Sequence, residues 1–202
     1  MENKTTITIS KGNRKMGEIK SVSLPPIVTC AENCTCAKKC YAAKICRLYK
    51  NVKESYNRNL EIFKTNPTAY WEQVDDSLST SRFFRMHVSG DIPTYEYLIQ
   101  MVETVRNNPH CDVLVFTKRY SFINTALENN VTFPSNLHIL FSEWTGMPMN
   151  NPYNLPVAHV IFKGETPKDN WNICTGNCLE CAKKKKNCWT LKNGEHVAFH
   201  EH

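Results

Sequence analysis

Short apolar strands alternate with helical segments through the middle of this chain, and this alternation constrains the fold more than any other feature. Strand patterns run over 83–89, 113–117, 137–142 and 157–162, and the segments between the first three carry the apolar spacing of amphipathic helices. The first three strands begin thirty and twenty-four residues apart. That is the length of a right-handed unit of one strand and one helix, repeated with the strands parallel. The sequence therefore predicts an α/β protein with a truncated, TIM-barrel-like parallel sheet.

The flanking segments extend this pattern at both ends. Alternating apolar residues over 19–24, followed by two prolines, predict a first strand. Apolar residues at intervals of three and four over 37–63 predict one long amphipathic helix, and Asn66–Pro67 begins another. The run HVAFHEH, from 196 to the end, is typical of an edge strand. With 202 residues and 41% hydrophobic content, we expect a single domain over the whole chain.

Nine of the ten cysteines fall into two groups. The first lies in a loop at 30–46, directly after the first predicted strand, and the second lies in a C-terminal tail at 171–189. Thiolates at such short spacing converge readily on one metal centre, because the loop between them can bend. The candidate metal ligands are Cys30, Cys34, Cys36 and Cys40 in the first group and Cys174, Cys178, Cys181 and Cys188 in the second. Cys46, inside a predicted helix, and Cys111, beside an apolar strand, are left out.

The spacing favours iron–sulfur clusters over zinc. Structural zinc sites usually draw their ligands from two CxxC knuckles, and the first loop has none. Cys174, Cys178 and Cys181 form a CxxxCxxC, a spacing in which three thiolates can hold a cubane cluster. We therefore predict one or two [4Fe–4S] clusters, with zinc as the alternative. The two groups either hold a cluster each or meet around one.

The chain has neither a run of eighteen apolar residues nor an apolar segment within its first fifteen. We therefore expect a cytoplasmic protein with no membrane partner, in which free thiols are more plausible than five disulfides. The formal net charge of +6 and the lysine run at 183–186 permit binding to nucleic acid through a basic surface. The same lysines are also typical of a solvated loop.

The carboxyl ends of parallel strands gather functional residues at one rim of the sheet. Ser89, Gly90 and Asp91 follow one predicted strand, and Lys118 follows the next. These four residues are the candidate cofactor contacts. Ser, Gly and Asp also form turns, so the first three can equally be a strand-ending turn.

Several short motifs carry a resemblance to a known family. They include Gly12-Asn13-x-Lys15-x-Gly17, Ser23-Leu24-Pro25-Pro26, Thr29-Cys30, Lys39-Cys40-Tyr41-Ala42 and Cys188-Trp189. Together with the closing cysteines they resemble the phage family called gene product 88, over most of the chain. That family has no characterised function, so the resemblance implies a viral source and action inside the host cytoplasm.

A more distant likeness is to the radical S-adenosylmethionine enzymes. These are partial TIM barrels with a cysteine loop after the first strand and a glycine turn after the second, which holds the amino group of the cofactor. Here Ser89-Gly90-Asp91 stands at the place of that turn, although CxxxCxxC lies in the tail and not in the first loop. The likeness implies S-adenosylmethionine as a further cofactor.

Two hypotheses follow. In the first, the chain is an enzyme that performs radical or redox chemistry at the rim, with Asp91 and Lys118 as substrate or cofactor contacts. In the second, the metal is structural and the basic tail and helix bind nucleic acid, with an affinity that falls as salt rises. The substrate is open in both.

Overall fold

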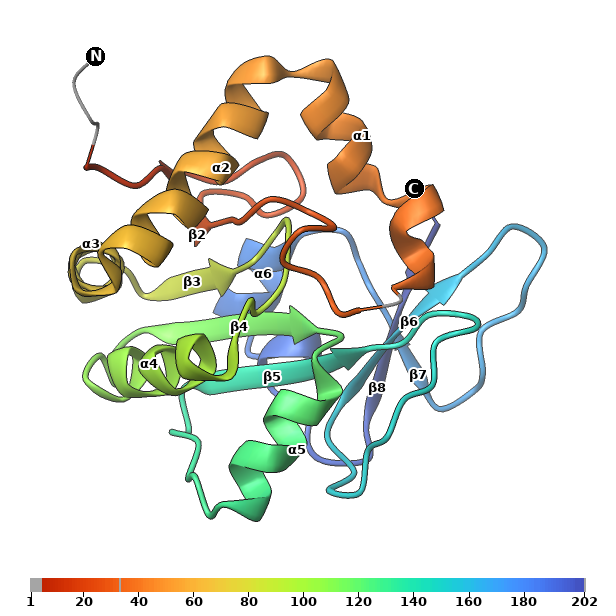
Figure 1. Ribbon diagram of the computed structural model, residues 1–202. Helices are drawn as coiled ribbons and strands as arrows, with labels where there is room; N and C mark the ends of the chain where they lie inside the picture. The colour runs from red at the N-terminus through yellow and green to blue at the C-terminus, as the bar shows by residue number, and fades with distance from the viewer. Residues whose placement is uncertain (1–4, 33, 202) are drawn as a thin grey trace.

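The fold is an open α/β sheet with helices on both faces (Figure 1). The computed structural model describes residues 5–32 and 34–201. These residues form one eight-stranded sheet in the order β1-β2-β3-β4-β5-β6-β8-β7, in which only β1 and β2 pair antiparallel. β1 and β7 are its two edges, and the predicted α/β class is confirmed. The strands are β1 Ile9–Ser10, β2 Lys20–Val22, β3 Phe83–Met86, β4 Asp112–Thr117, β5 Leu137–Ser142, β6 Val157–Ile161, β7 Trp171–Ile173 and β8 His196–His200.

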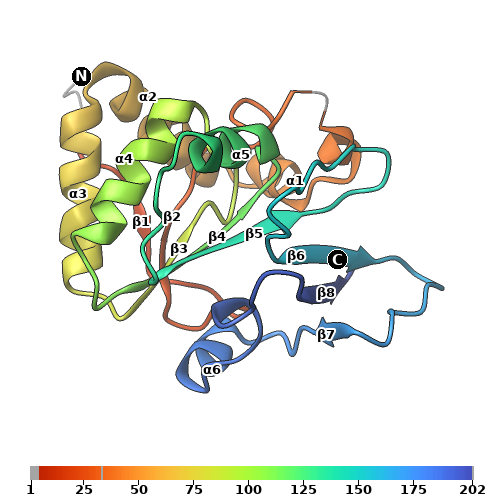
Figure 2. The ribbon, with the colours of Figure 1, turned by 90° about the horizontal axis from the view of Figure 1, so that it is seen from below.

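The helices divide between the two faces of the sheet. Figure 2 shows α2, α3, α4 and α5 on one side and α6 on the other. We call these the helix face and the tail face. None of the helices in the described residues is long and apolar enough to cross a membrane. The helical segments are η1 Thr35–Lys39, α1 Tyr41–Leu48, α2 Lys50–Thr65, α3 Pro67–Ser79, α4 Tyr95–Arg106, α5 Tyr120–Glu128, α6 Cys178–Lys183 and η2 Asn187–Trp189.

Alternation along the strands builds a separate core on each face. Phe84 and Met86 of β3 are fully buried on the helix face, among the apolar residues of α3 and α4. Leu114 of β4 points the other way, into a smaller core that the C-terminal tail completes with Cys181 and Trp189. The tail therefore covers the tail face of the sheet, as the crossover helices cover the helix face.

An N-terminal turn holds this tail in place. The backbone N–H of Cys178 donates to the carbonyl of Lys15 at 3.0 Å. Gly17, with φ +69°, leaves so little space that an added Cβ would lie 2.8 Å from the Cβ of Leu179. The glycine lets the turn pack directly on α6, and this contact joins the two ends of the chain.

Two expected elements differ from the structure. The single long helix predicted over 37–63 is three segments, because Tyr49 is extended between α1 and α2 and residues 35–39 form a 3₁₀ turn. The terminal strand predicted at an edge is β8, which lies between β6 and β7. β7 was not predicted, and it takes the edge position. Pairing order is a tertiary property that alternation cannot show.

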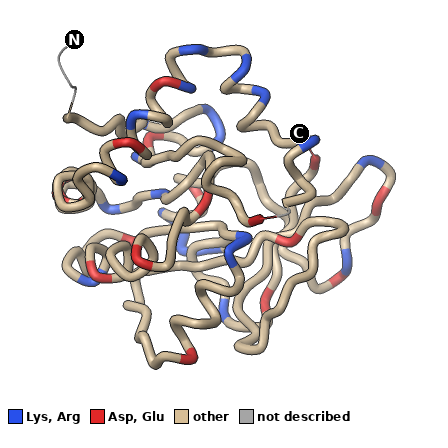
Figure 3. Tube along the Cα trace, viewed as in Figure 1, with Lys and Arg blue, Asp and Glu red and all other residues tan. Residues whose placement is uncertain are grey.

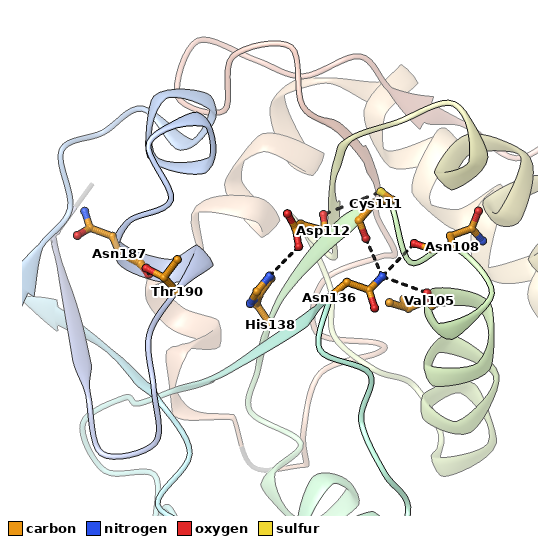
Figure 4. Close-up of polar contacts among 8 residues, drawn as sticks. All are labelled: Val105, Asn108, Cys111, Asp112, Asn136, His138, Asn187 and Thr190. Carbon is orange, nitrogen blue, oxygen red and sulfur yellow. Dashed lines mark hydrogen bonds and ion pairs between the residues drawn. The ribbon is translucent and has the colours of Figure 1, made fainter.

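The amino ends of β4 and β5 are fixed by one buried amide (Figure 4). The Nδ2 group of Asn136 donates to the carbonyls of Val105 at 3.1 Å, Asn108 at 3.0 Å and Cys111 at 2.8 Å. His138 Nε2 and Asp112 Oδ1 lie 3.3 Å apart beside it. This end of the sheet is thus closed by structural contacts, and the opposite end is left for function.

Candidate metal centre

Both cysteine groups line one cavity. It has a volume of about 720 Å³ and extends from the carboxyl ends of the strands over the tail face of the sheet. The two groups are more than 130 residues apart in the sequence, since Cys40 and Cys174 are 134 positions apart. Neither spacing nor composition predicts that they share a cavity. Its cysteine lining comprises Cys30, Cys34, Cys36, Cys40, Cys174, Cys178, Cys181 and Cys188, all of them unbridged.

The first group sits on the loop between β2 and α1. The backbone N–H of Ile27 donates to Cys30 Sγ at 3.2 Å, and that of Ala43 donates to Cys40 Sγ at 3.5 Å. Cys40 is the N-cap of α1, so its sulfur lies at the positive end of that helix. Cys34 Sγ and Cys36 Sγ are 2.7 Å apart. N–H groups aimed at sulfur stabilise the thiolate form that binds metals.

Burial and a hydrogen bond between two thiols shift the pKa values of the first cysteine group. Burial raises the pKa of Cys30 to about 11, against the opposing hydrogen bond from Ile27. The Cys36 thiol donates to Cys34, which lowers the pKa of Cys34 and raises that of Cys36. The Lys118 ammonium lowers the pKa of both. Without metal, Cys30 and Cys36 therefore keep their protons, and metal binding would release them.

The second group surrounds the short helix α6. The backbone N–H of Gly176 donates to Cys174 Sγ at 3.4 Å, and Asn187 Nδ2 donates to Cys181 Sγ at 3.7 Å. Burial, together with the other three thiols of the group and against the opposing charge of Arg85, raises the pKa of Cys188 to about 12. Four sulfurs therefore lie within electrostatic reach of one another on the tail face.

Neither group is already closed around a point. Among residues 5–32 and 34–201, no three His, Cys, Asp or Glu side chains converge where a metal ion could sit. Ligation would need the thiol side chains to turn toward one another. The two cysteines set aside by the sequence argument do not line the cavity, and Cys111 is fully buried beside β4. Cys46 lies on α1.

The four predicted cofactor contacts all line the cavity at its rim. Ser89 Oγ is buried and has no hydrogen-bond partner among the described residues. Lys118 Nζ donates to Ser142 Oγ at 2.7 Å and lies 5.9 Å from the centre of the Trp144 ring. Both residues line the same cavity as the first cysteine loop.

Asp91 and Gly90, the other two of these residues, make their contacts with other parts of the protein. Asp91 Oδ1 accepts from Thr117 Oγ1 at 2.7 Å and from its neighbour's backbone N–H, and Oδ2 accepts from the Lys118 N–H at 2.8 Å. Its own N–H donates to Thr29 Oγ1 at 3.1 Å. Burial raises the pKa of Asp91, and those donors oppose the rise. Asp91 thus ties the segment after β3 to the end of β4 through its carboxylate, and to Thr29, next to the first cysteine loop, through its backbone N–H.

Arg85 is a cavity residue that the sequence analysis missed. It lies in the middle of β3, and its guanidinium carbon is 4.9 Å from the centre of the Phe116 ring. Its Nη1 donates to Cys178 Sγ at 3.9 Å. The sequence does contain one indication of it. Arg85 stands between apolar residues in FFRM, and a charged residue is unusual in a strand that is otherwise buried on both faces. Cys30 to Cys40 lie at one end of the cavity, and Arg85 lies beside the other cysteine group.

Charges elsewhere are mixed along the chain, and Figure 3 shows acidic and basic positions interspersed over most elements. The lysine run 183–186 begins at the last residue of α6, and Lys184 pairs with Glu180 at 3.6 Å. The predicted basic surface therefore has partial ion pairing on the tail. Basic residues also follow one another along α1 and into α2, where Lys50 pairs with Glu54 at 3.8 Å.

Comparison with known proteins identifies the family but not the chemistry. No protein with a curated description and no solved structure matches the chain, so nothing there supports the likeness to radical S-adenosylmethionine enzymes. The model of one family, described as Gene product 88, matches residues 2–197. This match covers nearly the whole chain and agrees with the resemblance that the N-terminal motifs and closing cysteines carry. The chain therefore belongs to the phage gene product 88 family.

Proposed function

We propose that this protein is an iron–sulfur protein in which each four-cysteine group holds one cluster, most simply of the [4Fe–4S] type. The observation that carries the proposal is the shared cavity. Eight unbridged cysteines from distant parts of the chain line a single space of about 720 Å³. Cysteines that only fill a hydrophobic core are not expected to line one cavity in two groups of four.

The residues present offer the ligands of such a group, which would close around it when the thiol side chains turn toward one another. Each set offers four thiols, which is the ligand number of a cubane cluster. Backbone or side-chain N–H groups already point at Cys30, Cys40, Cys174 and Cys181. Hydrogen bonds of this kind tune the potential of a cluster, and Lys118 and Arg85 supply positive charge near the two sets.

The chemistry we propose is one-electron redox or radical chemistry on a molecule held in the cavity. When bound, a cluster of this type supplies or accepts one electron at a time. Ser89 and Lys118 are placed to bind the molecule at the rim, and S-adenosylmethionine is the cofactor that the distant family likeness suggests there. The Trp144 ring lines the cavity and packs edge-on against Phe162 at 5.4 Å.

We also propose that the sheet is a truncated TIM barrel. Support comes from the consecutive parallel order of β2 to β6 and from the cavity at their carboxyl ends. The tail face, which would be the inside of a barrel, is the face that the second cysteine group fills. We expect the protein to work in the reducing host cytoplasm, which keeps thiols free for metal.

Metal and sulfide analysis of protein purified without oxygen tests the proposal. We expect roughly eight iron and eight acid-labile sulfide per chain, with a reduced-state paramagnetic resonance spectrum typical of [4Fe–4S] clusters. Cys36→Ala and Cys178→Ala should each remove about half of the iron, since each breaks one site. Cys46→Ala is the matched control and should keep all of it, because Cys46 does not line the cavity.

Two results would change this picture. Loss of all iron in both single variants would mean that the two groups hold one shared cluster. Zinc without labile sulfide would overturn the proposal and favour a structural metal. The test of nucleic-acid binding and of its salt dependence would then come next.

A further inference from the structure

The lining of the cavity carries four basic and two acidic side chains. The charged residues of the cavity lining are Lys15, Lys39, Arg85, Lys118, Asp91 and Glu201. Glu201 pairs with Lys39 at 3.1 Å, and both oxygens of Asp91 are occupied by donors from the protein. Neither carboxylate is therefore available to balance Arg85.

Arg85 itself is incompletely satisfied. In the part of the chain that the structure describes, its guanidinium has no carboxylate within ion-pair distance, and its buried Nε has no hydrogen-bond partner. The 3.9 Å contact with Cys178 is long and uses one of five N–H groups. A thiolate of Cys178 in the second metal site would meet Nη1 alone, so the remaining donors of this partly buried guanidinium are left to pair with a further anion.

The surroundings of Arg85 are aromatic. Its guanidinium stacks over Phe116, which meets Phe199 edge-on at 5.7 Å, and Lys15 Nζ lies 5.2 Å from the centre of the Phe199 ring. The wall therefore offers cations next to apolar ring faces. The whole cavity, of about 720 Å³, lies within the range of ligand pockets, and the two proposed clusters at the cysteine groups would take part of that volume.

We propose that the cavity between the two cysteine groups binds a small anionic molecule with a planar or apolar body, whose carboxylate or phosphate pairs with the guanidinium of Arg85. The apolar body lies along Phe116 and Phe199, and its other end points toward the rim that Ser89 and Lys118 line. This inference deepens the proposed function, on which it rests, by naming the class of molecule held between the two metal sites.

Calorimetric titration of the full chain, purified without oxygen, tests this inference. The probes are 1-naphthyl phosphate and 1-naphthoate, which separate phosphate from carboxylate, and uncharged 1-naphthamide. We expect one of the anions to bind and the amide to bind at least tenfold more weakly. Arg85→Gln should weaken the better anion by about ten- to a hundredfold, as expected when a charged hydrogen-bond donor is lost. Arg85→Lys, which keeps the charge but not the fork, should recover part of the affinity.

Arg82→Gln is the matched control. Arg82 precedes the same strand, is exposed and does not line the cavity, so the variant removes the same charge outside the site. We expect its affinity to stay within about twofold of the wild type, because exposed charges contribute little. Equal weakening by both variants, or no binding of either anion at millimolar concentration, would overturn the inference.

Iron and sulfide are measured on every sample, so the two proposals can fail separately. If the iron content is full and the affinity for the anionic probes does not change in Arg85→Gln, only the proposed anion site is overturned. A change in iron content or reduction potential in Arg85→Gln, without a change in probe affinity, would assign Arg85 to the second metal centre and would also overturn it. Binding that depends on Arg85 in a chain without iron would keep the anion site and reject the clusters.

Discussion

At the scale of single residues, Gly90 shows how the rim is built. Its φ is +78°, and an added Cβ would lie 2.6 Å from Thr29 Oγ1 and 2.7 Å from the Leu24 carbonyl oxygen. Gly90→Ala should therefore suffer both backbone strain and a clash with the strand that leads to the first cysteine loop. We expect a loss of about 2–5 kcal/mol in the free energy of unfolding, measured by urea denaturation.

Gly146→Ala separates the two causes. Gly146 has nearly the same φ, +77°, but nothing within 4 Å of its added Cβ. This variant should lose only about 1 kcal/mol, the cost of placing alanine in a left-handed conformation. Equal losses in the two variants would mean that the contact with Thr29 and Leu24 is not tight.

The same residues mark how far the sequence could be interpreted. The pattern correctly placed Ser89, Gly90, Asp91 and Lys118 at the strand ends, because parallel strands bring their carboxyl ends together. The pattern could not show that the carboxylate oxygens of Asp91 accept hydrogen bonds from hydroxyl and backbone donors, because those donors lie on another segment of the chain. Arg85 was missed for a related reason, because a strand pattern does not show which face stays open.

At the scale of elements, the C-terminal tail replaces a crossover helix. Trp189 of η2 is 4% exposed and packs with Leu114 and Leu140, and its ring meets Phe83 edge-on at 5.5 Å. Trp189→Ala should cost about 3–5 kcal/mol of stability, because it empties the centre of the smaller core. Chemical denaturation measures this loss, and metal content should fall with it because Cys188 is the preceding residue.

Tyr49→Ala is the comparison, since Tyr49 lies between α1 and α2 and is 54% exposed. We expect it to cost less than about 1 kcal/mol. A small loss at Trp189 would show that the tail is not part of the cooperative core. Sequence patterns did not predict this core, because α6 and η2 are too short for helical periodicity and β7 has only three residues.

At the scale of the whole molecule, the two ends of the chain meet at one cavity while the middle builds the scaffold. Helices α3, α4 and α5 pack against the helix face, on the far side of the sheet from the second cysteine group. The free energy of metal binding is free energy of folding for the segments that supply the ligands. Metal should therefore stabilise the two cysteine segments far more than it stabilises this scaffold.

Hydrogen exchange measured by mass spectrometry, with metal-loaded and metal-free protein compared, tests this division. Protection should rise on loading in peptides from 27–49 and from 174–191, and stay nearly constant in 67–128. The scaffold peptides serve as the internal control, since a general change in stability would move them as well. Protection confined to one segment would leave one metal site in place of two. A uniform change would mean that the cysteine segments do not respond to metal separately from the sheet, contrary to a cavity built by the chain's two ends.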